Sequence, residues 1–157
     1  MAHAIFEPGD RLDFAHPIVR EAVYTDIGAR ARANAHARAA RLLAERGAAD
    51  ERIAAQIAAA EPSGDPARVE LLRRVAADAL GRGAPAAAVA WLTRALAEPP
   101  PPADRGEVLL ALGGAELRLG HPGAVPHLGE AVELIRAPEG SEQVGRASCR
   151  ERVFITV

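Results

Sequence analysis

The sequence lacks several features that would assign it to a common functional class. It has no lysine, so its 19 basic residues are all arginine, and aromatic residues make up only 3% of the chain. Its single cysteine cannot form a disulfide within the chain, which is typical of proteins in a reducing cytoplasm. No apolar run approaches the roughly 20 residues of a membrane span, and the N-terminus lacks a signal-peptide pattern. We therefore expect a cytoplasmic protein with no membrane partner.

Motifs of catalysis and cofactor binding are also missing. The chain has no G-x-x-x-x-G-K-[ST] phosphate loop, no G-x-S-x-G nucleophile turn and no H-E-x-x-H zinc motif. Five histidines share no metal-ligand spacing, and no pair of cysteines accompanies them. They are His3, His16, His36, His121 and His127. We expect a chain that is not an enzyme, has no catalytic residue and binds no metal or cofactor.

Alanine dominates what is present. Hydrophobic residues make up 49% of the chain, nearly half of them alanine, and this composition favours closely packed helices with small contact residues. The length of 157 residues suffices for one modest core or a short row of helical repeats. A net charge of −2 argues against a protein built mainly to hold nucleic acid. The sequence therefore predicts an all-α fold.

The stretch from residue 5 to residue 27 combines a predicted β-hairpin with a predicted helix. Leu12 and Phe14 follow the period-two pattern of a half-buried strand, and the turn residues 7–10 separate this strand from an earlier one. Pro17 suits the first position of a helix because it has no N–H to donate. The apolar face of this helix is predicted to consist of Val19, Ala22, Val23 and Ile27. A hairpin leading directly into a helix is typical of the end of a winged-helix unit.

The same stretch resembles a family of bacterial regulators. In the large LuxR-type, MalT-like transcription factors with a STAND-type ATPase module (the LAL group), the pattern F-x-H-P-[LI]-V-R-[ED]-A-[VL]-Y recurs where the ATPase module ends. The matching residues here are Phe14, His16, Pro17, Ile18, Val19, Arg20, Glu21, Ala22, Val23 and Tyr24. We interpret them as a hinge motif.

The resemblance has consequences for cofactors and partners. It implies the end of a winged-helix arm followed by a helical-repeat region, with ATP bound only by a module that would precede residue 1. The implied partners are the regulator's own ATPase and DNA-binding domains and an effector ligand or protein. Direct DNA binding by this chain is not expected.

Two helices are predicted between the hinge motif and residue 61. Residues 29–46 form a long helix that Gly47 ends, and Asp50 can cap a second helix with Ile53 and Ile57 one turn apart. The apolar stripe of the long helix is predicted to be Ala35, Ala39, Leu42 and Leu43. Residues 61–64 read as a loop.

Two similar helical hairpins are predicted after the loop. Asp65 and Pro66 start the first one, and the turns beginning at Gly83 and Gly120 lie 37 positions apart. This spacing resembles the ~34 residues of a tetratricopeptide repeat, and the start of a right-handed solenoid is expected. Predicted inward residues of the first hairpin are Val69, Leu72, Ala76, Ala79, Leu80, Val89, Leu92 and Leu96. Those of the second are Val108, Leu109, Leu112, Ala115, Val125, Leu128, Val132 and Ile135.

These patterns divide the chain into four parts. Residues 1–47 are interpreted as the winged-helix end with the first long helix, 48–64 as a linker helix and loop, and 65–140 as two tetratricopeptide-like hairpins. Residues 141–157 lose the helical period, and GRASCRERV in this tail resembles a translated sequencing-adaptor remnant. We expect the tail, with Cys149, to be non-native.

Three functions remain open. The first is a non-catalytic segment of an ATP-dependent regulator that couples domains and serves as a sensor or scaffold. The second is a free-standing helical-repeat adaptor, for which Trp91 is a candidate partner contact, although helical spacing favours a core position for it. The third is a small winged-helix DNA-binding protein that would use an arginine stripe. The stripe consists of Arg30, Arg32, Arg38 and Arg41, and such stripes are more often solvated or packed on a neighbour.

Overall fold

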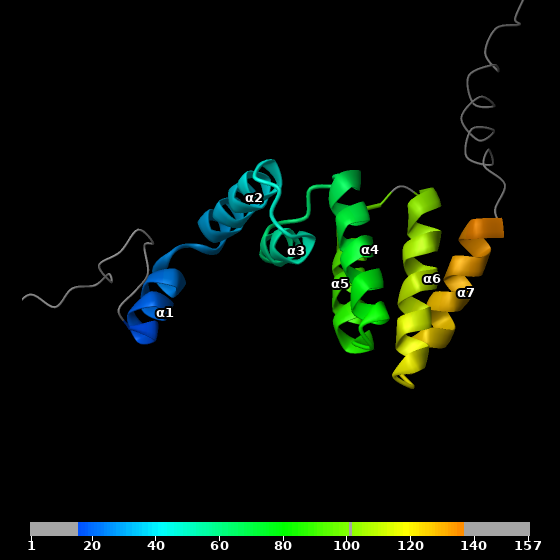
Figure 1. Ribbon diagram of the computed structural model, residues 1–157. Helices are drawn as coiled ribbons and strands as arrows, with labels where there is room; N and C mark the ends of the chain where they lie inside the picture. Colours follow the sequence, from blue (N-terminus) through cyan, green and yellow to red (C-terminus); the bar gives the residue numbers. More distant parts are fainter. Residues whose placement is uncertain (1–15, 101, 137–157) are drawn as a thin grey trace, which may run out of the picture. The chain divides into compact units, whose positions relative to one another are not determined.

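The computed structural model describes residues 16–100 and 102–136, and all regular structure in these ranges is helical (Figure 1). The predicted all-α fold is therefore confirmed for this part of the chain. The predicted β-hairpin and the tail at 141–157 lie outside the described residues. None of the described helices is long and apolar enough to cross a membrane.

The chain forms two compact units, Met1–Glu61 and Pro62–Val157. The described part of the first unit contains α1 (Pro17–Asp26), α2 (Ala29–Glu45) and α3 (Asp50–Ala59). The second contains α4 (Pro66–Gly81), α5 (Pro85–Ala97), α6 (Pro102–Arg118) and α7 (Ala124–Arg136).

Prolines and one aspartate mark the helix starts as predicted. Pro17, Pro66 and Pro85 each occupy the first turn of a helix, where the missing N–H costs no hydrogen bond. Asp65 caps α4, because its carboxylate accepts the backbone N–H of Ala67 at 2.9 Å. The prediction that Asp50 caps a helix is wrong: it is the first residue of α3, whose cap position is Ala49.

Three glycines end the first helix of three successive helix pairs in the same way. Gly47, Gly83 and Gly120 have φ angles of 65°, 73° and 65°, in the left-handed region that glycine adopts without strain. In each case the next residue's N–H bonds to a carbonyl five residues earlier, as in a Schellman motif. These glycines lie 36 and 37 residues apart, so the same helix ending already occurs in the α2–α3 pair. The first repeat was predicted to begin later, at residue 65.

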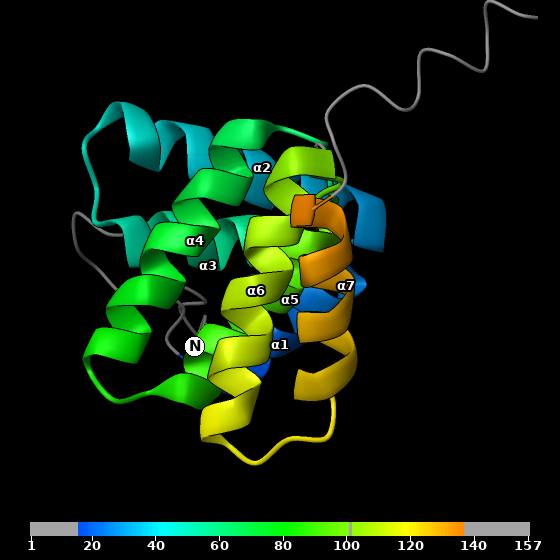
Figure 2. The same cartoon turned by 90° about the vertical axis from the view of Figure 1, so that its right-hand side faces the viewer.

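In the second unit, α4 to α7 run alternately in opposite directions, and each packs on the next (Figures 1 and 2). Among the residues that the structure describes, the largest fully buried apolar side chains all belong to this unit, and they include Leu72, Leu92, Leu109 and Leu112. All four predicted inward residues of α6 are buried, which confirms that part of the pattern. Val75 of α4 is also buried and was not predicted.

The predicted inward face of α7 is wrong for three of its four residues, and the fourth, Leu128, is half-buried. Ala124 and Ala131 are buried, whereas Val125, Val132 and Ile135 are 76%, 42% and 54% exposed. The cause lies in α6, whose glycines allow α7 to approach closely through small residues. A Cβ at Gly113 would lie 2.6 Å from Cγ of Leu128 on α7.

On α5 and α2 as well, the buried residues include alanines that the sequence pattern did not predict as inward. In α5 the buried residues are Ala88, Leu92 and Ala95, while Val89 and Leu96 are only half-buried. In α2 the buried residues are Ala33 and Ala40, and the predicted stripe residues Ala35 and Leu42 are exposed. The helices therefore approach one another at alanine and glycine, and several branched side chains lie beside the contact. On α3, Ile53 and Ile57 are buried one turn apart, as predicted.

Candidate coupling site in the first unit

The described residues of the hinge motif form α1 and its cap. Phe14 lies outside the described residues, and His16 is the cap residue with extended backbone angles. The His16 side chain makes no capping hydrogen bond, but its carbonyl accepts the N–H groups of Val19 and Arg20 at 3.1 and 3.2 Å. Pro17 starts the helix as predicted. The motif therefore fixes where α1 begins.

No side chain of α1 is buried. Ile18 is 82% exposed, Val23 is 43% exposed and Val19 is half-buried. A shallow, open groove runs along one side of the helix between Ile18 and Asp26, and Glu21 and Ala22 also line it. The predicted apolar face of α1 therefore exists as a pattern but forms no core in the described structure.

Arg32 on α2 terminates α1. Its Nη1 donates to the carbonyl oxygens of Tyr24, Thr25 and Ile27 at 3.1, 3.2 and 2.6 Å. The last carbonyls of a helix lack partners within the helix and carry partial negative charge, so a guanidinium there satisfies them and stabilises the helix dipole. α1 has no glycine cap and no basic residue in its last turn. Arg32 therefore supplies the hydrogen-bond donor and the positive charge that the last turn of α1 does not provide itself.

A hydrogen-bonded chain links α1, α2 and α3. The Tyr24 hydroxyl lies 2.9 Å from Nε2 of His36, and Nδ1 of the same ring lies 2.8 Å from Oε1 of Gln56. The Tyr24 and His36 rings also make an edge contact with centroids 6.0 Å apart, and the Arg32 guanidinium lies 5.0 Å from the Tyr24 ring centroid. We refer to Tyr24, Arg32, His36 and Gln56 as the α1 clamp.

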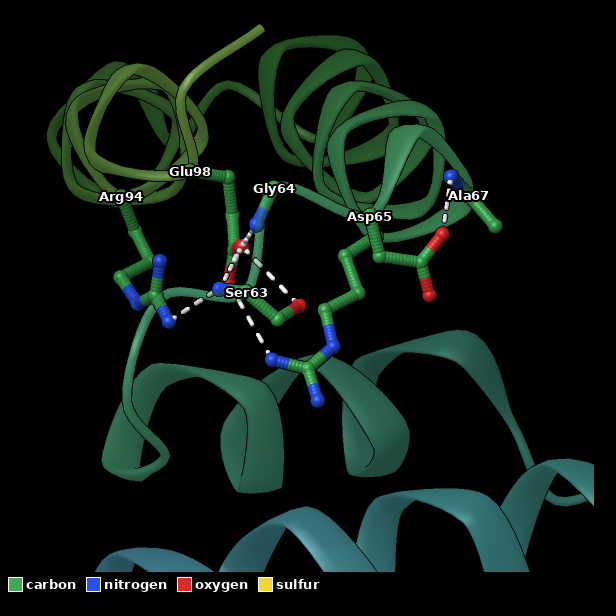
Figure 3. A network of polar contacts seen from close by, with 7 residues as sticks. Ser63, Gly64, Asp65, Ala67, Arg94 and Glu98 are labelled. Atoms are coloured by element: carbon green, nitrogen blue, oxygen red, sulfur yellow. Dashed lines mark hydrogen bonds and ion pairs between the residues drawn. The ribbon is translucent and has the colours of Figure 1, made fainter.

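The second unit contains a buried carboxylate that binds the first residues of that unit. Glu98 follows α5 and is fully buried, and its Oε2 accepts the backbone N–H groups of Ser63 and Gly64 at 2.6 and 3.0 Å (Figure 3). Its Oε1 accepts from Arg94 at 2.9 Å and from Arg68 at 3.4 Å. This cluster fixes the loop before α4 to the end of α5.

The hydrogen bonds of Glu98 decide its protonation state. Burial by itself raises the pKa of this carboxyl group, but the N–H groups of Ser63 and Gly64 and the positive charge of Arg94 more than offset burial. The pKa of Glu98 therefore lies below its usual value of 4.5. The group is ionised at neutral pH, and its place in the fold is structural.

Two of the histidines lie beside another buried carboxylate. Nδ1 of His127 is 2.7 Å from Oε2 of Glu116, a residue only 4% exposed. His121 accepts the backbone N–H of Gly123 at 3.1 Å, and its Nδ1 lies 3.6 Å from Oε1 of Glu116. These contacts fix the turn between α6 and α7. In residues 16–100 and 102–136 no group of three or more His, Cys, Asp or Glu residues can hold a metal ion.

Trp91 and the arginine stripe have separate surroundings. Trp91 is half-buried on α5 in the second unit. Arg32 is bound to the end of α1, while Arg30, Arg38 and Arg41 are exposed. The stripe therefore divides into one clamp residue and three surface residues.

Sequence reasoning found Tyr24 through the hinge motif but missed its partners. Arg32 was assigned to a basic stripe, and His36 and Gln56 had no assigned role. The sequence alone does not signal the role of Arg32, because Gly28 stands where a helix-ending glycine is expected. Its φ of −54° keeps it out of the left-handed conformation, so the last carbonyls of α1 need a donor from elsewhere. Comparison with known protein families, curated proteins and solved structures gave no match to this chain.

Proposed function

We propose that this chain is a non-catalytic coupling and scaffold segment of an ATP-dependent, LuxR-type transcriptional regulator. The observation that carries the proposal is the joint at α1. The helix that contains most of the hinge motif buries no side chain and is attached to α2 and α3 through polar contacts. Helices held in this way can change position without the loss of a hydrophobic core. In this function α1 receives movement from an upstream ATPase module.

The second unit supports the scaffold part of the proposal. A groove of about 270 Å³ lies along α4 and extends to Leu92 of α5 and Ala111 of α6. It combines alanines with the charged side chains of Glu70 and Arg73, and an ion pair joins Arg73 to Glu107 of α6. A mixture of small apolar and charged groups in a groove suits a protein segment. The sensor role of the regulator is placed here, with an effector protein or ligand as partner.

A free-standing adaptor is the second candidate, and one observation favours it. Val89 and Leu96 on α5, a helix that packs on both α4 and α6, are half-buried. The corresponding residues on α7, 36 positions later, are Val125 and Val132, and both are exposed. Positions that are half-buried on α5 thus form an exposed apolar edge on α7, which suits contact with another helix. A winged-helix DNA-binding role has less support, because Arg32 is already bound within the chain.

Reading the genomic DNA on both sides of this coding sequence tests the proposal. The coupling function requires an in-frame upstream module with a G-x-x-x-x-G-K-[ST] loop and a downstream DNA-binding domain. Stop codons and a separate promoter directly flanking the coding sequence would contradict it and favour the adaptor. Titration calorimetry with magnesium-ATP adds a direct check, because the coupling function predicts no saturable binding by this chain alone.

A further inference from the structure

We propose that the α1 clamp is a relay, in which Gln56 of α3 sets the state of His36 and thereby the hold on Tyr24 of α1. The inference rests on the proposed coupling function and names the positioning residues that would carry it. Movement of α1 would reach α3 through three side chains, and a change at α3 would loosen or tighten α1 in return.

The first step of the argument is that α1 depends on the clamp. A helix of 10 residues is shorter than isolated helices that are stable in water. α1 gains nothing from buried side chains, and Gly28 after its C-cap has a φ of −54° and does not form a left-handed cap. The contacts from Arg32 and His36 therefore hold it in place, with the two hydrogens of Arg32 Nη1 shared among three carbonyl oxygens.

The second step concerns the hydrogen of the His36 ring. A neutral imidazole donates from one nitrogen and accepts at the other. Oε1 of Gln56 is an acceptor, so Nδ1 of His36 donates to it and carries the ring hydrogen. Nε2 is then the acceptor, and the Tyr24 hydroxyl donates to it. Gln56 thus selects the tautomer that can receive the Tyr24 hydrogen bond, as a second partner commonly does for histidine.

The third step is that this arrangement transmits in both directions. Withdrawal of Gln56 removes the preference for hydrogen on Nδ1, so part of the His36 population would carry its hydrogen on Nε2. The Tyr24 hydroxyl could then only accept from His36, and a phenol oxygen is a weaker acceptor than its O–H is a donor. If Tyr24 moves away, Nε2 of His36 loses its hydrogen-bond donor, and the His36 ring is no longer bound to α1. Because the contacts span three helices, a displacement at one end changes the hydrogen bonding at the other.

The test uses the full chain with two readouts, amide hydrogen exchange of α1 and the ¹⁵N spectrum of the His36 ring. Gln56→Ala should mix the His36 tautomers and speed exchange of the α1 amides by about fivefold, as expected for one net hydrogen bond. Tyr24→Phe should speed exchange similarly. Gln56→Ala should then add nothing in the Tyr24→Phe background, because the relay is already broken at its end.

A matched pair on α2 isolates the cap. Arg32→Gln should speed α1 exchange by at least about tenfold, since a charge-assisted set of hydrogen bonds is lost. Arg30→Gln makes the same chemical change at an exposed position whose side chain donates no hydrogen bond to the α1 carbonyls, and it should leave α1 unchanged. Amide exchange of α2 and α3, recorded in the same experiment, checks that each variant keeps the rest of the first unit folded.

Three results would overturn the relay. The first is an unchanged His36 tautomer in Gln56→Ala. The second is multiplication of the Tyr24→Phe and Gln56→Ala effects in the double variant. The third is equal behaviour of the two arginine variants. Any of these would leave the regulator assignment standing, whereas flanking DNA without an ATPase module would remove that assignment and leave the relay standing.

Discussion

Two adjacent glycines in α6 provide a sharp test of how α6 and α7 pack. Gly113 and Gly114 are both inside the helix, where alanine is favoured over glycine by about 0.5–1 kcal/mol. A Cβ at Gly113 would lie 2.6 Å from Cγ and 2.8 Å from Cδ2 of Leu128, and 3.2 Å from the carbonyl oxygen of Ala124. A Cβ at Gly114 would meet nothing within 4 Å. The same substitution should therefore have opposite effects at neighbouring positions.

The magnitude follows from two contributions. Gly114→Ala should raise the free energy of unfolding by about 0.5–1 kcal/mol through helix propensity alone. Gly113→Ala gains the same contribution but forces Leu128 and the α7 backbone to shift, and such overpacking costs about 1–3 kcal/mol. Because the propensity contribution cancels between the two variants, their difference should be about 1–3 kcal/mol.

Urea unfolding followed by tryptophan fluorescence measures this difference. Trp91 is the single tryptophan of the chain and lies in the same unit as both glycines, so its signal reports that unit. Adding Leu128→Ala to Gly113→Ala should recover part of the loss, because the clashing atoms are removed. Equal stabilisation by both alanine substitutions would refute the close α6–α7 contact.

Other predictions concern the buried carboxylate, the exposed α7 edge and nucleotide binding. Glu98→Ala should cost about 3–5 kcal/mol in urea unfolding, because buried N–H groups and Arg94 lose their partner. The folded-state pKa of Glu98 is lowered, so its contribution is present above the usual value of 4.5 and is lost as pH falls through the lower folded value. Glu98→Gln should accordingly be less stable than the parent at pH 7 and lose less stability below pH 4.5. Val125→Ser and Val132→Ser should leave the urea midpoint nearly unchanged, whereas a large loss in either would show that the edge is part of the core. Calorimetry with magnesium-ATP should give no saturable binding.

Helix boundaries were predictable because local chemistry determines them. Glycine in the left-handed region ends α4 and α6, and proline begins α4 and α5, whatever the tertiary contacts. Such signals depend on a few neighbouring residues and can be read without knowing the fold. The repeat in the second unit followed from them directly.

The inward face of α7 was not predictable because it depends on the partner helix. Val125 and Val132 fit an amphipathic pattern well, yet both are exposed. Of the predicted residues, Leu128 does make the contact, against Gly113, and the fit arises from a missing side chain on α6. Hydrophobic periodicity measures the apolar character of a face, whereas close packing selects the smaller residues.

The contacts of the α1 clamp were also not predictable, because they join polar groups on different helices. Tyr24 was found because it belongs to the hinge motif, but its contact to His36 spans 12 residues, and that from His36 to Gln56 spans 20. No period or spacing rule connects these positions. Gly28 follows the C-cap of α1 and suggests a helix ended by glycine, so nothing in the sequence pointed to Arg32 as the donor, and Arg32 was assigned to a surface stripe.

The most direct test of the coupling function is amide exchange of α1 with and without magnesium-ATP in the longer protein, with an upstream ATPase module, that the proposed function requires. The account predicts that nucleotide changes exchange in α1 there and changes nothing in this chain alone. Unchanged α1 exchange in a longer protein that binds ATP would contradict the account, as would a response of the isolated chain.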